Sequence, residues 1–117
     1  MSKESRDFKL FALNGKLLGI KVDKDARTVH VGKEGGFITG ATAVVEESGA
    51  VSARFTATRI ALMGPFALAF KKKKDQRSLY LTLESPEFLT GVEISVKDEQ
   101  RAREWAREFN KYSRNAE

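Results

Sequence analysis

The sequence contains no cysteine, only one histidine and only two prolines in 117 residues. Without cysteine the chain can form no disulfide, no thiolate metal cluster and no thiol nucleophile, and a cytoplasmic location is favoured. The single histidine, His30, has no partner at a metal-ligand spacing, so we expect no metal and no cofactor. No nucleophile motif accompanies it either, and we expect a protein that is not an enzyme.

Long apolar runs are also missing. The longest, from Ile60 to Phe70, is interrupted by Gly64-Pro65 and falls short of the roughly 20 residues of a membrane-spanning helix. The first residues alternate charges where a signal peptide would carry an apolar core. The sequence therefore predicts neither a membrane span nor secretion.

The composition is that of a soluble globular domain, with 41% hydrophobic and 32% charged residues. A chain of this length suits one domain with one core. We expect an N-terminal extension over residues 1–15, a folded domain over 16–113 and a short tail over 114–117. The extension, which includes the apolar stretch from Phe8 to Leu13, favours an extra strand, with a short helix as the alternative.

Alternation of apolar and polar residues recurs through most of the chain, which is the pattern of half-buried strands. The glycine-rich stretch 32–40 interrupts it and is expected to be a turn or bulge. We expect seven strands, with inward residues at Leu18, Ile20 and Val22; Val29 and Val31; Ala41, Ala43 and Val45; the stretch 51–63; Phe66, Leu68 and Phe70; Leu79, Leu81 and Leu83; and Phe88, Val92, Ile94 and Val96.

The period changes after Lys97, where apolar residues recur at intervals of three and four and predict an amphipathic helix to about Ser113. Ser95 and Asp98 have the spacing of a capping box at its start. The expected fold is mainly β, in the α+β class: a two-sheet barrel of about seven antiparallel strands, capped by this helix. The residues expected to close the core are Ala102, Trp105, Ala106 and Phe109.

Several stretches resemble small bacterial proteins of actinobacterial type with a pleckstrin-homology-like (PH-like) domain. They are the stretch 56–65 (TATRIALMGP), the lysines 71–73, the stretch 77–84 (RSLYLTLE), and the stretch 96–98 with Ala102, Ala106 and Phe109 behind it. The resemblance implies a PH-like fold and a binding or assembly module. Its partner would be another protein or a second copy of the chain, with no small-molecule substrate. We expect such a partner at a groove beside the seventh strand and the helix, or at a sheet edge.

The net charge of +5 is concentrated in one segment. Residues 71–77 carry five basic side chains and one acidic side chain, which leaves +1 for the rest of the chain. The simplest interpretation is a solvated hairpin tip whose like charges discourage sheet association. The alternative is an electrostatic site for anionic membrane or nucleic acid, formed by Lys71, Lys72, Lys73, Lys74 and Arg77.

Two weaker motifs, for phosphoinositide and for RNA binding, are better explained as ordinary structural segments. The stretch 21–27 has the basic character of a phosphoinositide site, but its spacing is wrong and Asp23 and Asp25 would repel phosphate. The Gly32–Gly35 segment matches a GxxG pattern that in RNA-binding domains joins two helices, whereas strands are expected here. Phe37 and Tyr80 are the two aromatic residues expected to face outward.

Overall fold

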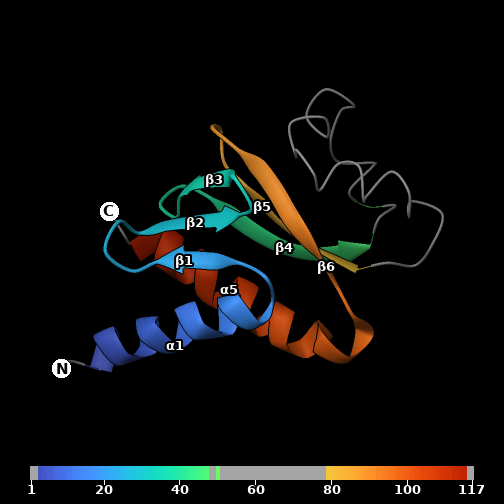
Figure 1. Cartoon of the computed structure of the whole chain (residues 1–117), viewed down its shortest axis with the longest axis horizontal. Coiled ribbons are helices and arrows are strands. Elements are labelled where there is room, and N and C mark those ends of the chain that lie inside the picture. Colours follow the sequence, from blue (N-terminus) through green and yellow to red (C-terminus); the bar gives the residue numbers. More distant parts are fainter. Residues whose placement is uncertain (1–2, 48–49, 51–78, 116–117) are drawn as a thin grey trace.

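The computed structural model describes residues 3–47, 50 and 79–115. Within these residues the chain is an α+β protein, with two antiparallel sheets of three strands each and a helix at either end (Figure 1). The elements are α1 (Lys3–Leu17), β1 (Lys21–Asp23), β2 (Thr28–Val31), β3 (Glu34–Phe37), β4 (Thr42–Glu47), β5 (Leu79–Glu84), β6 (Leu89–Ile94), the 3₁₀ turn η1 (Val96–Asp98) and α5 (Glu99–Asn115).

Both sheets follow the order of the chain, β1-β2-β3 in the first and β4-β5-β6 in the second. In the first sheet Val22 lies opposite Val29, and Val29 lies opposite Gly36. In the second sheet Leu83 of the central strand lies opposite Ala43 and Thr90. The expected antiparallel sheets and C-terminal helix are confirmed at this level. The described strands do not close into a barrel, and the strands expected over 51–63 and 66–70 lie outside the described residues.

Residues 3–17 form α1, so the N-terminal extension is helical, which agrees with the short-helix alternative, and the favoured strand is wrong. Phe8, Phe11, Gly15 and Leu18 are all buried, at the spacing of three and four residues that one helix face requires. Leu10 and Leu13 add apolar residues outside this stripe, so the segment lacks the clean contrast of an amphipathic helix. The same residues imitate the alternation of a strand.

The glycine-rich stretch is not only a turn, because Glu34–Phe37 within it forms β3. A two-residue turn at Gly32-Lys33 connects β2 to β3, and Gly32 takes a left-handed φ of 61° there. Gly35 has no room for a side chain, since a Cβ at this position would overlap the Val29 carbonyl oxygen and lie 2.8 Å from the His30 Cα. Glycine at position 35 therefore permits β2 and β3 to pair closely, where a residue with a side chain would not fit.

Two side-chain orientations also differ from expectation. Tyr80 is fully buried, because β5 is the central strand of its sheet and both of its faces are buried from Tyr80 to Leu83. Alternation along such a strand no longer separates core from solvent. Val96 is 77% exposed, because the strand ends at Ile94 and Val96 begins η1.

The core lies where α1, α5 and the two sheets meet, and Figure 1 shows the two helices together on one side of the strands. The apolar stripe of α5 is buried there through Ala102, Trp105, Ala106 and Phe109. The expected capping box does not form: Ser95, which precedes η1, makes no side-chain bond to the backbone there, and its hydroxyl donates to the Asp98 carboxylate at 2.9 Å. Among the described helices, none combines the length and apolar character needed to cross a bilayer.

Candidate binding groove between α1 and β1

Trp105 holds α1 against α5. Its ring stacks on Phe11 with centroids 4.7 Å apart and planes 6° apart, and its indole Nε1 donates a hydrogen bond to the Phe11 carbonyl oxygen at 2.9 Å. A Cβ at Gly15 would lie only 3.0 Å from the same nitrogen, so glycine lets the helix approach this closely. This contact fixes which side of α1 faces the core and which side faces outward.

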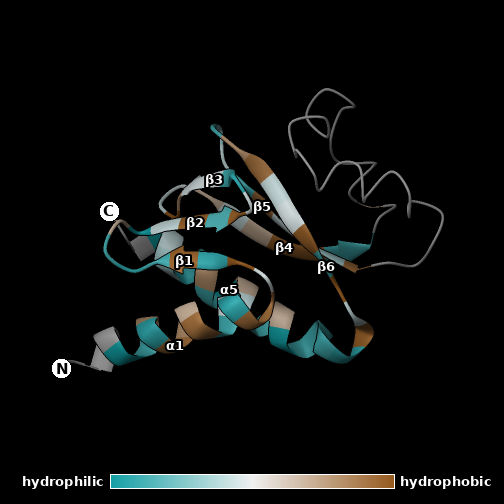
Figure 2. Ribbon diagram, viewed as in Figure 1, coloured by the Kyte–Doolittle hydropathy of each residue, from teal (hydrophilic) through white to brown (hydrophobic). Residues whose placement is uncertain are grey.

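The outward side of α1 carries three leucines, Leu10, Leu13 and Leu17, which are 58%, 54% and 60% exposed. Their spacing of three and four residues places them on one face of the helix. Figure 2 shows hydrophobic residues in successive turns of α1. A contiguous apolar stripe of this kind is more informative than scattered exposed residues, because such patches mark interaction sites.

Beside this stripe lies a groove of about 1110 Å³ between α1 and β1. Val22 contributes apolar surface from the strand side, above the buried Ile20, and Leu10, Ala12 and Leu13 contribute it from the helix side. Gly19, in the turn that joins the two elements, takes a left-handed φ of 90° and brings β1 back along α1. The groove therefore follows directly from the tight return of the chain after the helix.

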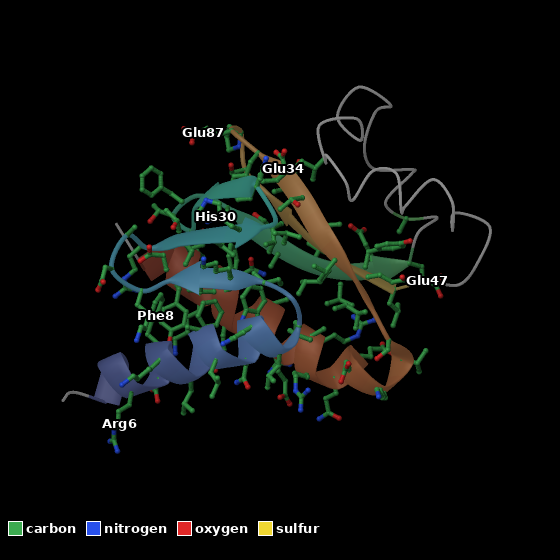
Figure 3. The ribbon with its side chains drawn as sticks, in the orientation of Figure 1. Arg6, Phe8, His30, Glu34, Glu47 and Glu87 are labelled. Atoms are coloured by element: carbon green, nitrogen blue, oxygen red, sulfur yellow. The ribbon has the colours of Figure 1, made fainter. Side chains whose placement is uncertain are left out.

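The charged side chains that line the groove are all basic. They are Arg6, Lys9, Lys16, Lys21 and Lys24. Figure 3 shows the Arg6 side chain extending away from the body of the molecule. The groove thus combines an apolar floor with a positively charged rim. It lies beside a sheet edge, which is one of the two locations expected from the sequence.

The acidic residues near α1 lie elsewhere. Glu108 of α5 has its pKa raised, mainly by burial and also by the neighbouring Asp7 carboxylate. Asp23, at the end of β1, does not line the groove, and its carboxylate accepts the backbone N–H groups of Asp25 and Ala26 at 2.9 and 3.0 Å. These two hydrogen bonds lower the pKa of Asp23 and keep it ionised within its turn.

The turn after β1 also places Arg27 over the Phe8 ring, 4.1 Å from its centroid. Arg27 adopts a left-handed φ of 57° in doing so, and Figure 3 places Phe8 between α1 and the strands above it. Arg27 therefore ties the β1–β2 turn to the N-terminal half of α1 through a cation–π contact.

The open edge of β1 contrasts with that of β4. Asn110 of α5 covers the β4 edge, since its side-chain Oδ1 accepts the Ala43 N–H at 2.8 Å and its Nδ2 donates to the Ala43 carbonyl at 3.0 Å. The Ser113 hydroxyl donates to the Ala41 carbonyl at 2.7 Å. Strand β1, in contrast, pairs only with β2 in the described sheet, so its other edge borders the groove.

Replacing Asn110 with alanine is expected to lower the free energy of unfolding by about 1–3 kcal/mol, because the Ala43 N–H and C=O both lose their partner. Urea unfolding measures the change, and hydrogen exchange of the Ala43 amide should accelerate. Lys111→Ala, at the neighbouring exposed position, is the control and should leave both quantities unchanged. Equal stability of Asn110→Ala and the wild type would show that the β4 edge needs no cover.

The sequence-based candidates fare differently. The basic segment with Lys71, Lys72, Lys73, Lys74 and Arg77 lies outside the described residues and stays a prediction. His30 is half-buried on β2, and the described part of the chain holds no group of three His, Asp or Glu arranged for a metal. Phe37 is exposed as expected, at 60%.

Sequence reasoning missed the groove because it favoured a strand over a helix for the N-terminal residues. The available signal was the pair of helical stripes, one through Phe8, Phe11 and Gly15 and one through Leu10, Leu13 and Leu17. Comparison with known proteins gives no further guide, because no family model, curated protein or solved structure matches this chain.

Proposed function

We propose that the chain is a non-enzymatic binding module that holds a protein segment in the groove between α1 and β1. The finer assignment to a PH-like fold is part of this proposal. It rests on the sequence resemblance and on the order of antiparallel strands followed by a C-terminal helix. The helix α1 stands before the region that the resemblance covers.

The exposed leucine stripe is the observation that carries the proposal. Leu10, Leu13 and Leu17 are each more than half exposed on one face of α1. Full burial of a leucine side chain is worth about 1.5–3 kcal/mol, so covering part of three of them would supply useful binding free energy. The adjoining edge of β1 adds backbone donors and acceptors of the kind that an extended segment uses to extend a sheet.

Site-specific photo-crosslinking tests this function in the cell that makes the protein. A photoreactive phenylalanine analogue in place of Leu13 should give crosslinked protein adducts. The same analogue in place of Phe37, which is equally exposed but lies on β3, should give few. Light scattering of the purified protein across a concentration series then shows whether the crosslinked partner is a second copy. Absence of any adduct from position 13, together with a monomer at every concentration, would contradict the proposal.

A further inference from the structure

We infer that the occupant of the α1–β1 groove is an acidic segment of another protein in which apolar anchors alternate with carboxylates. This inference rests on the proposed function and gives the partner its chemistry. The groove offers an apolar floor between Ile20 and Leu13 and a rim in which Lys9 and Lys21 are among the cations. Both features have to be matched by the same ligand.

The charge of the rim selects an anion. Five of the eleven residues that line the groove are basic and none is acidic, although the chain as a whole has 16 acidic residues. Asp23, the nearest carboxylate on β1, is occupied by the backbone amides of its own turn. A segment that carries carboxylates would be attracted to this rim, and a basic segment would be repelled.

The strand side of the groove favours an extended segment. The described sheet gives β1 one neighbour, β2, so an added strand can pair with its other edge. Because side chains alternate along a strand, one set would face Val22 and Leu13 at the apolar floor while the other faced the basic rim. A sequence that alternates leucine with glutamate satisfies both surfaces.

Two other occupants fit the groove less well. A bilayer is flat on this scale and would touch the outward leucines of α1 without filling the recess between α1 and β1. A second copy carries the same net charge of +5 and the same basic rim, so the two copies would repel each other at this groove. An acidic segment of a different protein meets neither difficulty.

The test uses the full-length protein and a short fluorescent peptide in which glutamate and leucine alternate, with binding followed by fluorescence anisotropy. A peptide of the same length with glutamine in place of every glutamate is the matched probe. We expect the acidic peptide to bind at least about tenfold more tightly at about 50 mM salt, and the difference to shrink at about 300 mM salt. Equal affinity for the two peptides would overturn the inference.

Two pairs of variants locate the binding. Lys9→Gln with Lys16→Gln removes two rim charges and should weaken binding of the acidic peptide by about tenfold. Lys33→Gln with Lys97→Gln removes the same charge from exposed positions outside the groove and should change it little. Leu13→Ser should weaken both peptides, whereas Phe37→Ser, an equally exposed apolar position on β3, should weaken neither. Equal effects within either pair would place the binding elsewhere and overturn the inference.

Two further measurements separate the other occupants. Vesicles that contain phosphatidylglycerol should not sediment the protein; if they do and the acidic peptide fails to bind, the groove faces a membrane. A dimer that Leu13→Ser abolishes, again without peptide binding, would assign the groove to a second copy. A further outcome is that position 13 crosslinks to another protein while the acidic peptide binds no better than the glutamine peptide. That result would support the proposed binding function and reject only the inference that the partner segment is acidic.

Discussion

Replacement of Trp105 with alanine is expected to lower the free energy of unfolding by about 3–5 kcal/mol. The side chain is 98% buried, stacks on Phe11 and donates a hydrogen bond to the Phe11 carbonyl. Its loss would leave a cavity between α1 and α5 and remove the hydrogen bond that joins the two helices at the Phe11 carbonyl. Since domains are stable by about 5–15 kcal/mol in total, urea unfolding followed by circular dichroism should show a large fall in the midpoint.

Two controls separate the roles of Trp105. Trp105→Phe keeps an aromatic ring against Phe11 but removes the Nε1 donor, so we expect a smaller loss of about 1–3 kcal/mol. Arg101→Ala, on the exposed side of α5, should leave the midpoint nearly unchanged. If Trp105→Ala unfolds at the wild-type urea concentration, α1 is not held by this contact and the groove beside it loses its basis.

Replacement of Gly35 with alanine is expected to cost about 2–4 kcal/mol. The new Cβ would overlap the Val29 carbonyl oxygen, and both groups belong to the backbones of paired strands, so β2 and β3 would have to separate. Urea unfolding measures the cost. Amide chemical shifts of β2 should report the separation in the folded protein.

Gly36→Ala is the matched control for this prediction. Its Cβ would lie 2.9 Å from an atom of the buried Phe88 ring, and a side chain can shift by a few tenths of an ångström more easily than a carbonyl held between paired strands. We therefore expect a smaller loss of stability than for Gly35→Ala. The same loss for both variants would mean that the strands yield as easily as the ring does, and that Gly35 is not required for the pairing.

The C-terminal helix was predictable because its sequence offers only one solution. Ala102, Trp105, Ala106 and Phe109 form a single apolar stripe, the opposite side is charged, and Glu99 pairs with Arg103 at 2.8 Å on that side. The strands around Val29, Ala43 and Leu81 were predictable for the same reason, since each alternates between a buried and a more exposed face or lies in an apolar run.

The environment of a residue was not predictable where its sequence context suits more than one kind of structure. Gly35 and Gly36 look like turn residues, because glycine is uncommon in strands. Local sequence preference does not include the Val29 carbonyl, which lies next to Gly35 on the paired strand and leaves no room for a side chain. Tyr80 alternates with leucines as an outward residue would, and only its place on a central strand buries it.

The sequence by itself determined that the chain is rich in strands and that it ends in an amphipathic helix. The absence of cysteine also excluded disulfides and thiol chemistry. Only the tertiary structure decided which stripe of α1 is buried. Both stripes are apolar at helical spacing, but Gly15 leaves room for the Trp105 ring and Phe11 stacks on it. That close fit turns Leu10, Leu13 and Leu17 outward, beside a basic groove that no local pattern contains.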